Sequence, residues 1–236
     1  MQSQPIIGRF VPPIAWRGLE TVKRRLARWR RGRSGSDANT QDLAPYWEET
    51  MAQTLESWGE GTAWNEAQMF FLEAQGKVLD IACGTGKTIE LLSRLNPSLE
   101  IYGCDISEFL IQKAVERRGA RDRLAVCDAT NMMQYKDGSF DYAYSIGSLE
   151  HFTEDGIAKL LCETHRVVRR KSFHMVPVAK SGTNEGWVKT FQSYHNNSVE
   201  WWLARFQREF SSVHVFESAW EDKSSRGKWF VAGGSL

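Results

Sequence analysis

The sequence predicts an α/β fold, in which a mostly parallel sheet is covered by helices on both faces. From Lys77 onward, short apolar segments typical of buried strands alternate with segments whose apolar residues recur at helical spacing. Near the C-terminus, two further apolar segments are separated only by the turn at residues 222–227. Because so short a turn cannot support a crossover, we expect this last pair of strands to be antiparallel.

The pattern gives each element a range. The expected strands are residues 78–82, 101–104, 124–127, 140–146, 172–178, 213–218 and 228–232. The expected helices are residues 45–58, 63–74, 88–95, 108–118, 157–168 and 199–210. Gly76 follows the second of these helices and is a typical stop signal.

The composition is that of a soluble globular protein, with 42% hydrophobic and 25% charged residues among 236. No run approaches the roughly 18 consecutive apolar residues of a membrane span, and Pro12 and Pro13 stand where a secretory signal would have its apolar block. The four cysteines match neither a zinc-site spacing nor a CxxC pair. We therefore expect a cytoplasmic protein with reduced thiols and no metal site.

Charge divides the chain after residue 36. Residues 1–36 carry a net charge of +8, whereas residues 37–236 carry −7. In residues 15–29 the apolar side chains recur every three or four positions, so a helix there would have one apolar and one arginine-rich face. We expect a basic amphipathic arm, residues 1–36, followed by one domain, residues 37–236. The arm could contact a membrane surface through residues 13–33, or dock on the acidic body, a partner protein or nucleic acid.

The most informative segment is VLDIACGTGKT at residues 78–88, where a glycine-containing turn joins a strand to a helix. Gly84 and Gly86 let a ligand approach the backbone, and the amides at the helix start favour an anionic group. Two ligand classes fit poorly. A Walker phosphate loop needs glycine at the position of Ile81, and a dinucleotide site needs glycine at that of Ile89.

Acidic residues mark the ends of three expected strands. Asp80 precedes the turn, and Asp105 lies 19 positions after Gly86, where a carboxylate can accept hydrogen bonds from both hydroxyls of a ribose. Asp128 follows the third strand, where it could receive an exocyclic amine beside the backbone of Ala129. The set suits an adenosine-bearing ligand with a positive centre. The structural alternatives are that Asp105 caps a helix and that Asp128 is a turn residue.

Together these motifs resemble the class I S-adenosylmethionine-dependent methyltransferases over about residues 77–178. The resemblance implies a Rossmann-like three-layer sandwich with a seven-stranded, mostly parallel sheet, and S-adenosylmethionine as cofactor. It assigns cofactor binding to Asp80, Ala82, Gly84 and Gly86 at the methionine moiety, Asp105 and Ile106 at the ribose, Asp128 and Ala129 at the adenine, and Ser145 after the fourth strand. Ala82 departs from the family, which usually has glycine there.

The segment FDYAYSIGSLEHF also resembles this family, whose residues just past the fourth strand line the cofactor and the acceptor. His151 titrates near neutrality, as a general base should, and Glu150 could orient it or act as the base itself. The resemblance therefore implies methyl transfer to a hydroxyl or similar nucleophile, with His151 and Glu150 as catalytic residues. A purely structural histidine is the alternative.

The acceptor is expected to be a small molecule or a glycan. The opening RFVPPI and the basic segment after it resemble methyltransferases encoded with bacterial surface-glycan enzymes, which implies a role in polysaccharide biosynthesis. A natural-product acceptor and a methyltransferase-like nucleic-acid-binding module are the alternatives. We do not expect a nucleic-acid partner, because the domain is acidic and lacks an NPPY-type motif. Residues 179–197 could close over a substrate or form an ordinary surface loop.

The arm generates a prediction. The full-length protein should sediment with anionic but not neutral vesicles, because each Lys or Arg near an anionic surface contributes about 1 kcal/mol. The binding should be weaker at high salt, which screens these charges. A variant beginning at Asp37 should stay in solution. Indifference of the full-length protein to anionic vesicles at low salt would contradict the membrane interpretation.

Overall fold

The computed structural model of the chain describes residues 41, 43–119, 121–190 and 192–233, so the basic arm lies outside the described residues. A seven-stranded sheet with the strand order β3-β2-β1-β4-β5-β9-β8 forms its centre. The strands are β1 (Gly76–Ile81), β2 (Leu99–Asp105), β3 (Leu124–Val126), β4 (Phe140–Ile146), β5 (Val168–Ala179), β8 (Ser212–Glu221) and β9 (Ser225–Gly233). The two strands of a separate small sheet are β6 (Trp187–Val188) and β7 (Tyr194–His195).

The strand directions confirm the predicted mostly parallel sheet. The first five strands of the order pair in parallel, whereas β9 is antiparallel to both β5 and β8. The turn between β8 and β9 is held by Asp222, whose Oδ1 accepts hydrogen bonds from the amides of Ser224 at 2.8 Å and Ser225 at 2.7 Å. An aspartate that bonds its own following backbone in this way makes the short turn that forces antiparallel pairing.

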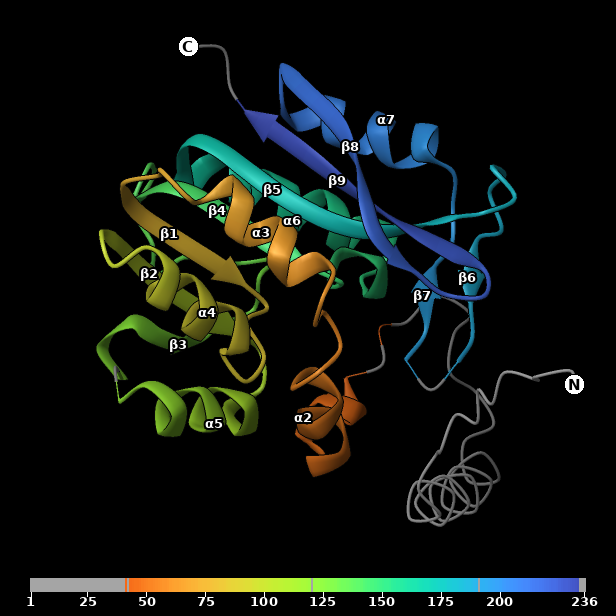
Figure 1. Cartoon of the computed structure of the whole chain (residues 1–236). Coiled ribbons are helices and arrows are strands. Elements are labelled where there is room, and N and C mark those ends of the chain that lie inside the picture. The colour runs from red at the N-terminus through yellow and green to blue at the C-terminus, as the bar shows by residue number, and fades with distance from the viewer. Residues whose placement is uncertain (1–40, 42, 120, 191, 234–236) are drawn as a thin grey trace, which may run out of the picture. The chain divides into compact units, whose positions relative to one another are not determined.

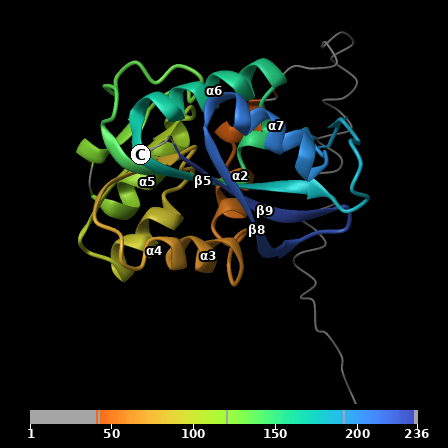
Figure 2. The same ribbon diagram turned by 90° about the horizontal axis from the view of Figure 1, so that it is seen from above.

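Helices cover both faces of the sheet (Figure 1). On one face lie α3 (Ala63–Phe70), α4 (Lys87–Leu95) and α5 (Glu108–Arg118), and on the other lie α6 (Glu154–Val167) and α7 (Val199–Glu209). Figure 2 shows α6 and α7 on the opposite side of the strands from α3 and α4. The predicted three-layer sandwich is confirmed.

Burial on both faces explains why the central strands are continuous apolar runs. In β1, Leu79 and Ile81 pack in one core cluster with Leu160 of α6, while Val78 packs in the other cluster with Ile89 of α4. Side chains alternate between the faces of a strand, so a central strand of a parallel sheet needs apolar residues at both parities.

The N-terminal helices are shorter than the sequence predicts. Residues 45–58 form a short 3-10 helix η1 (Ala44–Trp47) and then α2 (Glu49–Leu55), because the extended backbone of Glu48 (φ −110°, ψ 140°) separates them. In contrast, α5 and β4 have the predicted bounds at both ends. Within the described residues, no helix combines the length and apolar character needed to cross a membrane.

Candidate functional site

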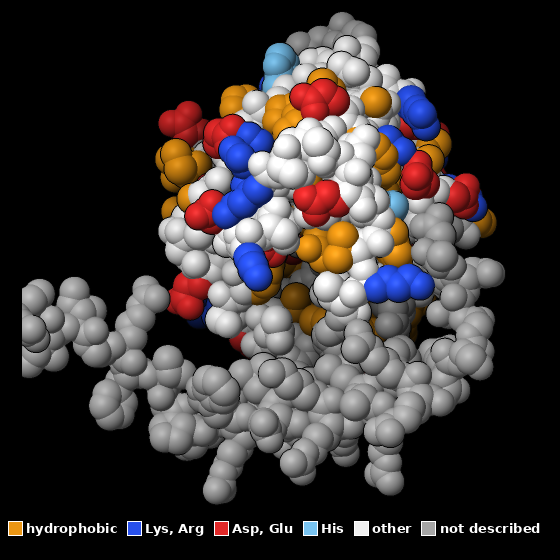
Figure 3. Space-filling model, turned by 90° about the vertical axis from the view of Figure 1, so that its right-hand side faces the viewer, with side chains coloured by type: hydrophobic (Ala, Val, Ile, Leu, Met, Phe, Trp, Pro, Cys, Tyr) orange, Lys and Arg blue, Asp and Glu red, His pale blue; other side chains and the backbone are white. Residues whose placement is uncertain are grey.

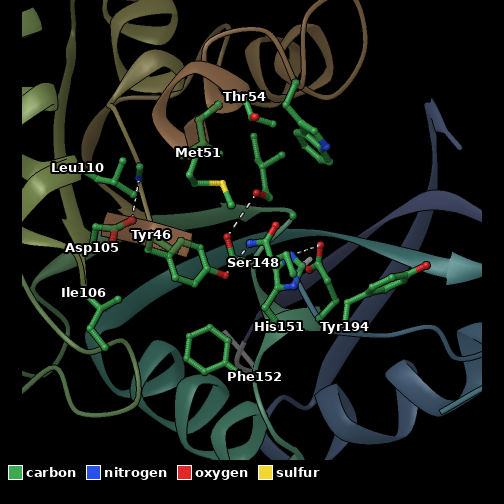
Figure 4. A pocket seen from close by; sticks show the side chains of 18 of the residues that line it. Tyr46, Met51, Thr54, Asp105, Ile106, Leu110, Ser148, His151, Phe152 and Tyr194 are labelled. Atoms are coloured by element: carbon green, nitrogen blue, oxygen red, sulfur yellow. Dashed lines mark hydrogen bonds and ion pairs between the residues drawn. The ribbon is translucent and has the colours of Figure 1, made fainter. Parts of the chain in front are cut away.

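A cavity of about 360 Å³ lies at the carboxyl ends of the parallel strands, where open α/β sheets bind ligands. Segments that follow β1, β2, β3 and β4 line one side, and residues of η1, α2, the β6–β7 segment and the β8–β9 turn line the rest. The predicted site residues that line it are Ala82, Gly84, Asp105, Ile106, Asp128, Ala129, Glu150 and His151. The fold therefore brings together most of the residues that the sequence singles out. Figure 4 labels Asp105, Ile106 and His151 among them.

Three predicted cofactor residues do not line this cavity. Asp80 lines an adjoining cavity of about 50 Å³. Gly86 is the N-cap of α4, and a Cβ at that position would lie 3.1 Å from the Cβ of Ala114 on α5. Ser145 is fully buried and bonds to Nδ1 of His174 at 2.8 Å. Gly86 thus permits close helix packing, and Ser145 lies apart from the cavity.

The Asp105 carboxylate connects the turn after β1 to the helix after β2. Its Oδ2 accepts a hydrogen bond from the amide of Gly84, and its Oδ1 accepts one from the amide of Ser107, both at 2.9 Å. Ser107, not Asp105, caps α5, because its hydroxyl accepts from the amide of Leu110. Burial raises the pKa of Asp105, and the amides partly offset this. A carboxylate has about four acceptor positions, so it can still receive two hydroxyl donors.

The turn after β1 is shaped for close approach. Gly84 has φ +53°, and a Cβ there would lie 2.9 Å from Cδ1 of Leu55 in α2. Ala82, where the family usually has glycine, has φ +59° and is the non-glycine residue with positive φ in the described part of the chain. The left-handed backbone is therefore kept at a cost of roughly 1–2 kcal/mol.

Four carboxyl groups line the main cavity within the described residues. Asp105, Asp128, Glu150 and Asp222 line it, and no described Lys or Arg does. Asp128 is exposed, and its Oδ1 accepts from the amide and hydroxyl of Thr130, both at 2.8 Å. This lining suits a ligand with a positive centre better than an anion.

Glu150 and His151 lie together in the 3-10 helix η3 (Leu149–His151) that follows β4. His151 Nδ1 lies 2.9 Å from the carbonyl oxygen of Ser193. A carbonyl only accepts, so Nδ1 carries the proton and Nε2 is left as an acceptor. That Nε2 lies 3.6 Å from Oε1 of Glu150.

Burial shifts both groups toward their neutral forms. It raises the pKa of Glu150 to about 8 and lowers the pKa of His151 to about 4. At neutral pH the carboxyl group is therefore protonated and the imidazole uncharged. Glu150 is 3% exposed, and its Oε2 has no hydrogen-bond partner among the described residues. A buried polar atom in that state destabilises the fold unless a ligand or water supplies the missing bond.

Asp80 is the other strongly perturbed acid. It is 4% exposed, and its Oδ2 accepts a hydrogen bond from the hydroxyl of Tyr144 at 2.7 Å. Burial raises the pKa of Asp80 well above its usual range, and the nearby Asp105 adds to the rise. Asp80 therefore bonds β1 to β4 and lines the smaller cavity rather than the main one.

Tyr46 spans the cavity, which the sequence did not establish. Its hydroxyl accepts a hydrogen bond from Nε2 of Gln192 at 2.7 Å, and its carbonyl oxygen accepts one from the Ser107 hydroxyl at 2.6 Å. Figure 4 shows the Tyr46 ring between Asp105 on one side and His151 on the other. An aromatic residue in a short helix is more often a packing residue, so only the fold distinguishes the two roles.

Two tryptophans at the cavity were not predicted. The ring centroids of Trp58 and Trp220 are 5.3 Å apart, and both side chains line the cavity. Trp58 rests on Gly147, which has φ +63° and where a Cβ would lie 2.8 Å from Cη2 of the ring. No local signal marks this contact, because the residues lie on elements far apart in the sequence.

In the segment 179–197, whose role the sequence left open, Tyr194 lines the cavity and Trp187 does not.

No cation-binding cluster was found in the part of the chain that the structure describes, as no three His, Cys, Asp or Glu side chains gather there in a way that could hold a metal. The cysteines Cys83, Cys104, Cys127 and Cys162 are free thiols.

Comparison with known proteins supports the fold. Residues 78–171 match the family model of a methyltransferase domain. The chain is 37% identical over 117 residues to a demethylmenaquinone methyltransferase of Thermotoga maritima, a match that covers 49% of each protein. It is 38% identical over 102 residues to a tRNA (carboxymethyluridine(34)-5-O)-methyltransferase of Arabidopsis thaliana, covering 43% of this chain and 23% of that protein. The chain thus spans half or less of the length of these relatives.

A solved structure extends the likeness over nearly the whole chain. The 1,6-didemethyltoxoflavin-N1-methyltransferase of Burkholderia thailandensis, solved with 1,6-didemethyltoxoflavin and S-adenosylhomocysteine, has a TM-score of 0.59 at 16% identity. The likeness covers 98% of this chain and 94% of that one. The Rossmann-like fold of methyltransferases, predicted from the sequence, is confirmed.

The raised pKa of Glu150 predicts a pH dependence of stability. Its pKa is about 8 in the folded state, and an unfolded glutamate titrates near about 4.3. Between these values the folded state binds the extra proton, so the free energy of unfolding should fall as pH rises, by about 1 kcal/mol per pH unit. Urea unfolding from pH 6.5 to 8 should show this fall for wild type relative to Glu150→Gln. His151 titrates near pH 6.5 only in the unfolded state, and this opposite contribution is common to wild type and Glu150→Gln, so it cancels in the difference.

The exposed Glu200 provides the control. Glu200→Gln should leave the pH dependence of wild type unchanged. A constant difference between wild type and Glu150→Gln across this range would contradict the shifted pKa.

Proposed function

We propose that the protein transfers a methyl group from S-adenosylmethionine to a hydroxyl or similar nucleophile of a small-molecule acceptor. The observation that carries the proposal is the Asp105 carboxylate, which lies in a cavity at the strand ends beside a glycine-containing turn. The match of residues 78–171 to a methyltransferase domain supports it. So does the S-adenosylhomocysteine bound to the structural neighbour from Burkholderia thailandensis.

The residues around the cavity fit this cofactor. Asp105 keeps acceptor capacity for two hydroxyls of a ribose, and Ile106 next to it offers an apolar surface to a nucleoside. Asp128 and Ala129 follow β3 and would face the adenine. The turn from Ala82 to Gly84 would hold the methionine moiety, and the carboxyl-rich lining suits the positive sulfur. When bound, the cofactor supplies a methyl group on a positively charged sulfur, which a nucleophile displaces.

The protein's own part in the reaction is to position the acceptor and remove its proton. His151 is in its neutral form at physiological pH, and Nε2 is its accepting atom because Ser193 fixes the proton on Nδ1. Oε1 of Glu150 lies 3.6 Å from that nitrogen. Together the protonated carboxyl group and the neutral imidazole can hold one further proton, on Nε2 of His151. Burial of this pair excludes water, which favours transfer to the bound acceptor over side reactions.

A nucleic-acid acceptor is the second candidate, because the relative from Arabidopsis thaliana is named as a tRNA methyltransferase. The described cavity lining argues against it, since phosphate groups would meet carboxyl groups and no described Lys or Arg. The face in Figure 3 carries positive and negative side chains interspersed, without a field of one sign. The proposed role in surface polysaccharide biosynthesis rests on residues 1–36, which lie outside the described part of the chain.

Cofactor binding tests the proposal. Calorimetry should show S-adenosylhomocysteine binding at micromolar Kd, and Asp105→Asn should weaken it by about 10-fold to 100-fold through loss of charge-assisted hydrogen bonds. His151→Ala serves as the control and should bind nearly as wild type does. Absence of binding to wild type, or tight binding of NAD or ATP instead, would contradict the proposed cofactor.

Turnover tests the proton acceptor. With labelled cofactor and an acceptor found by screening cell extracts, His151→Ala should lower turnover by about 10²–10⁴-fold without changing cofactor affinity. Retention of more than about a third of wild-type turnover would assign His151 a structural role.

A further inference from the structure

The cavity extends well beyond the residues that would hold the cofactor. We call this extension the acceptor region, and it is made of Trp58, Ser148, Glu150, His151, Tyr194 and Trp220. In Figure 4, Ser148, His151 and Tyr194 lie on the side of Tyr46 opposite to Asp105 and Ile106. The acceptor region therefore has its own walls, and their chemistry restricts what can bind there.

One wall is aromatic. Trp58 and Trp220 are in ring contact at 5.3 Å with an interplanar angle of 36°, and the Trp58 ring is seated on the bare backbone of Gly147. Phe152 and Pro177 add further apolar surface to the lining. Flat aromatic molecules gain most from such walls, because ring stacking adds to the burial of apolar area.

Polar groups gather at one end of the region. Glu150 and His151 lie 3.6 Å apart, and the buried Oε2 of Glu150 has no hydrogen-bond partner among the described residues. A single hydroxyl brought to this end can donate one hydrogen bond and leave the rest of the ligand against apolar surface. A sugar carries hydroxyls all around its ring, and most would lose their partners on burial.

The described lining of the cavity offers no cationic Lys or Arg side chain to an anionic group on the acceptor. The described residues of the lining include the carboxyl groups of Glu150 and Asp222 and no Lys or Arg, the side chains that bind phosphate and carboxylate. A phosphorylated acceptor would therefore lose its hydration beside the Asp222 carboxylate, with no described Lys or Arg in the lining to compensate.

We infer that the acceptor is an aromatic molecule that bears a hydroxyl group and carries no phosphate or carboxylate, with its ring against Trp58 and Trp220 and its hydroxyl at Glu150 and His151. This inference rests on the proposed function and names the substrate class of the same cavity. It excludes nucleotide-linked sugars and nucleic acids as the molecules that enter the acceptor region.

Calorimetry with a matched pair of probes tests the inference. The protein is first titrated with S-adenosylhomocysteine, and the saturated complex is then titrated with 2-naphthol or 2-naphthyl phosphate. We expect 2-naphthol to bind at least about tenfold more tightly than its phosphate ester. Trp58→Ala and, independently, Trp220→Ala should each weaken 2-naphthol binding by about tenfold, whereas Trp47→Ala should not. Trp47 is the control because it is 45% exposed and does not line the cavity.

The outcomes separate the inference from the proposed function. If S-adenosylhomocysteine does not bind, the proposed function is wrong. If it binds but 2-naphthol does not, or if the phosphate ester binds as tightly, the acceptor class inferred here is wrong and the proposed function stands. Binding of 2-naphthol that neither tryptophan variant weakens would also overturn the inference, because it would place the probe elsewhere.

Discussion

The site depends on one buried carboxylate. Asp105 stands at the end of β2, which lies between β3 and β1, and accepts hydrogen bonds from the amides of Gly84 and Ser107. These bonds fix the turn after β1 and the start of α5 relative to each other. Ser107 passes the constraint on, since its hydroxyl donates to the carbonyl of Tyr46, whose own hydroxyl is bonded by Gln192. Through Tyr46, these hydrogen bonds connect Asp105 and Ser107 to Gln192 in the segment between β6 and β7.

Much of the fold could be predicted because periodicity reports burial directly. The ranges of β4 and α5 are as predicted, since both are bounded by clear turn or capping residues such as Ser107 and Gly119. The helix predicted at residues 45–58 was overestimated, because apolar periodicity does not reveal the extended Glu48. At the site, motifs at the strand ends located Asp105 and Asp128, whereas Trp58 and Trp220 come together only through tertiary packing. Ser145 shows the limit of a motif: a strand residue points to one face, and here that face meets His174.

The acceptor end combines two groups that burial keeps uncharged. At neutral pH the buried side chain of Glu150 carries no charge, because its pKa of about 8 keeps it protonated, so no carboxylate has to be desolvated. His151 is held in one tautomer by the Ser193 carbonyl, and its pKa of about 4 makes it a neutral acceptor rather than a strong base. In the proposed reaction a weak base would be sufficient, because the positive sulfur already activates the methyl donor. Oε2 of Glu150 has no hydrogen-bond partner among the described residues, which lowers the stability of the fold. Such a cost is typical of a binding site, where a ligand supplies the missing bond.

The central claim is that one cavity holds cofactor and acceptor at opposite sides of Tyr46. A crystal structure of the protein with S-adenosylhomocysteine tests it most directly. We predict the ribose hydroxyls at the Asp105 carboxylate, the nucleoside base near Asp128 and Ala129, and the sulfur atom directed toward the acceptor region. A nucleoside bound against Trp58 and Trp220, or bound away from Asp105, would contradict the account.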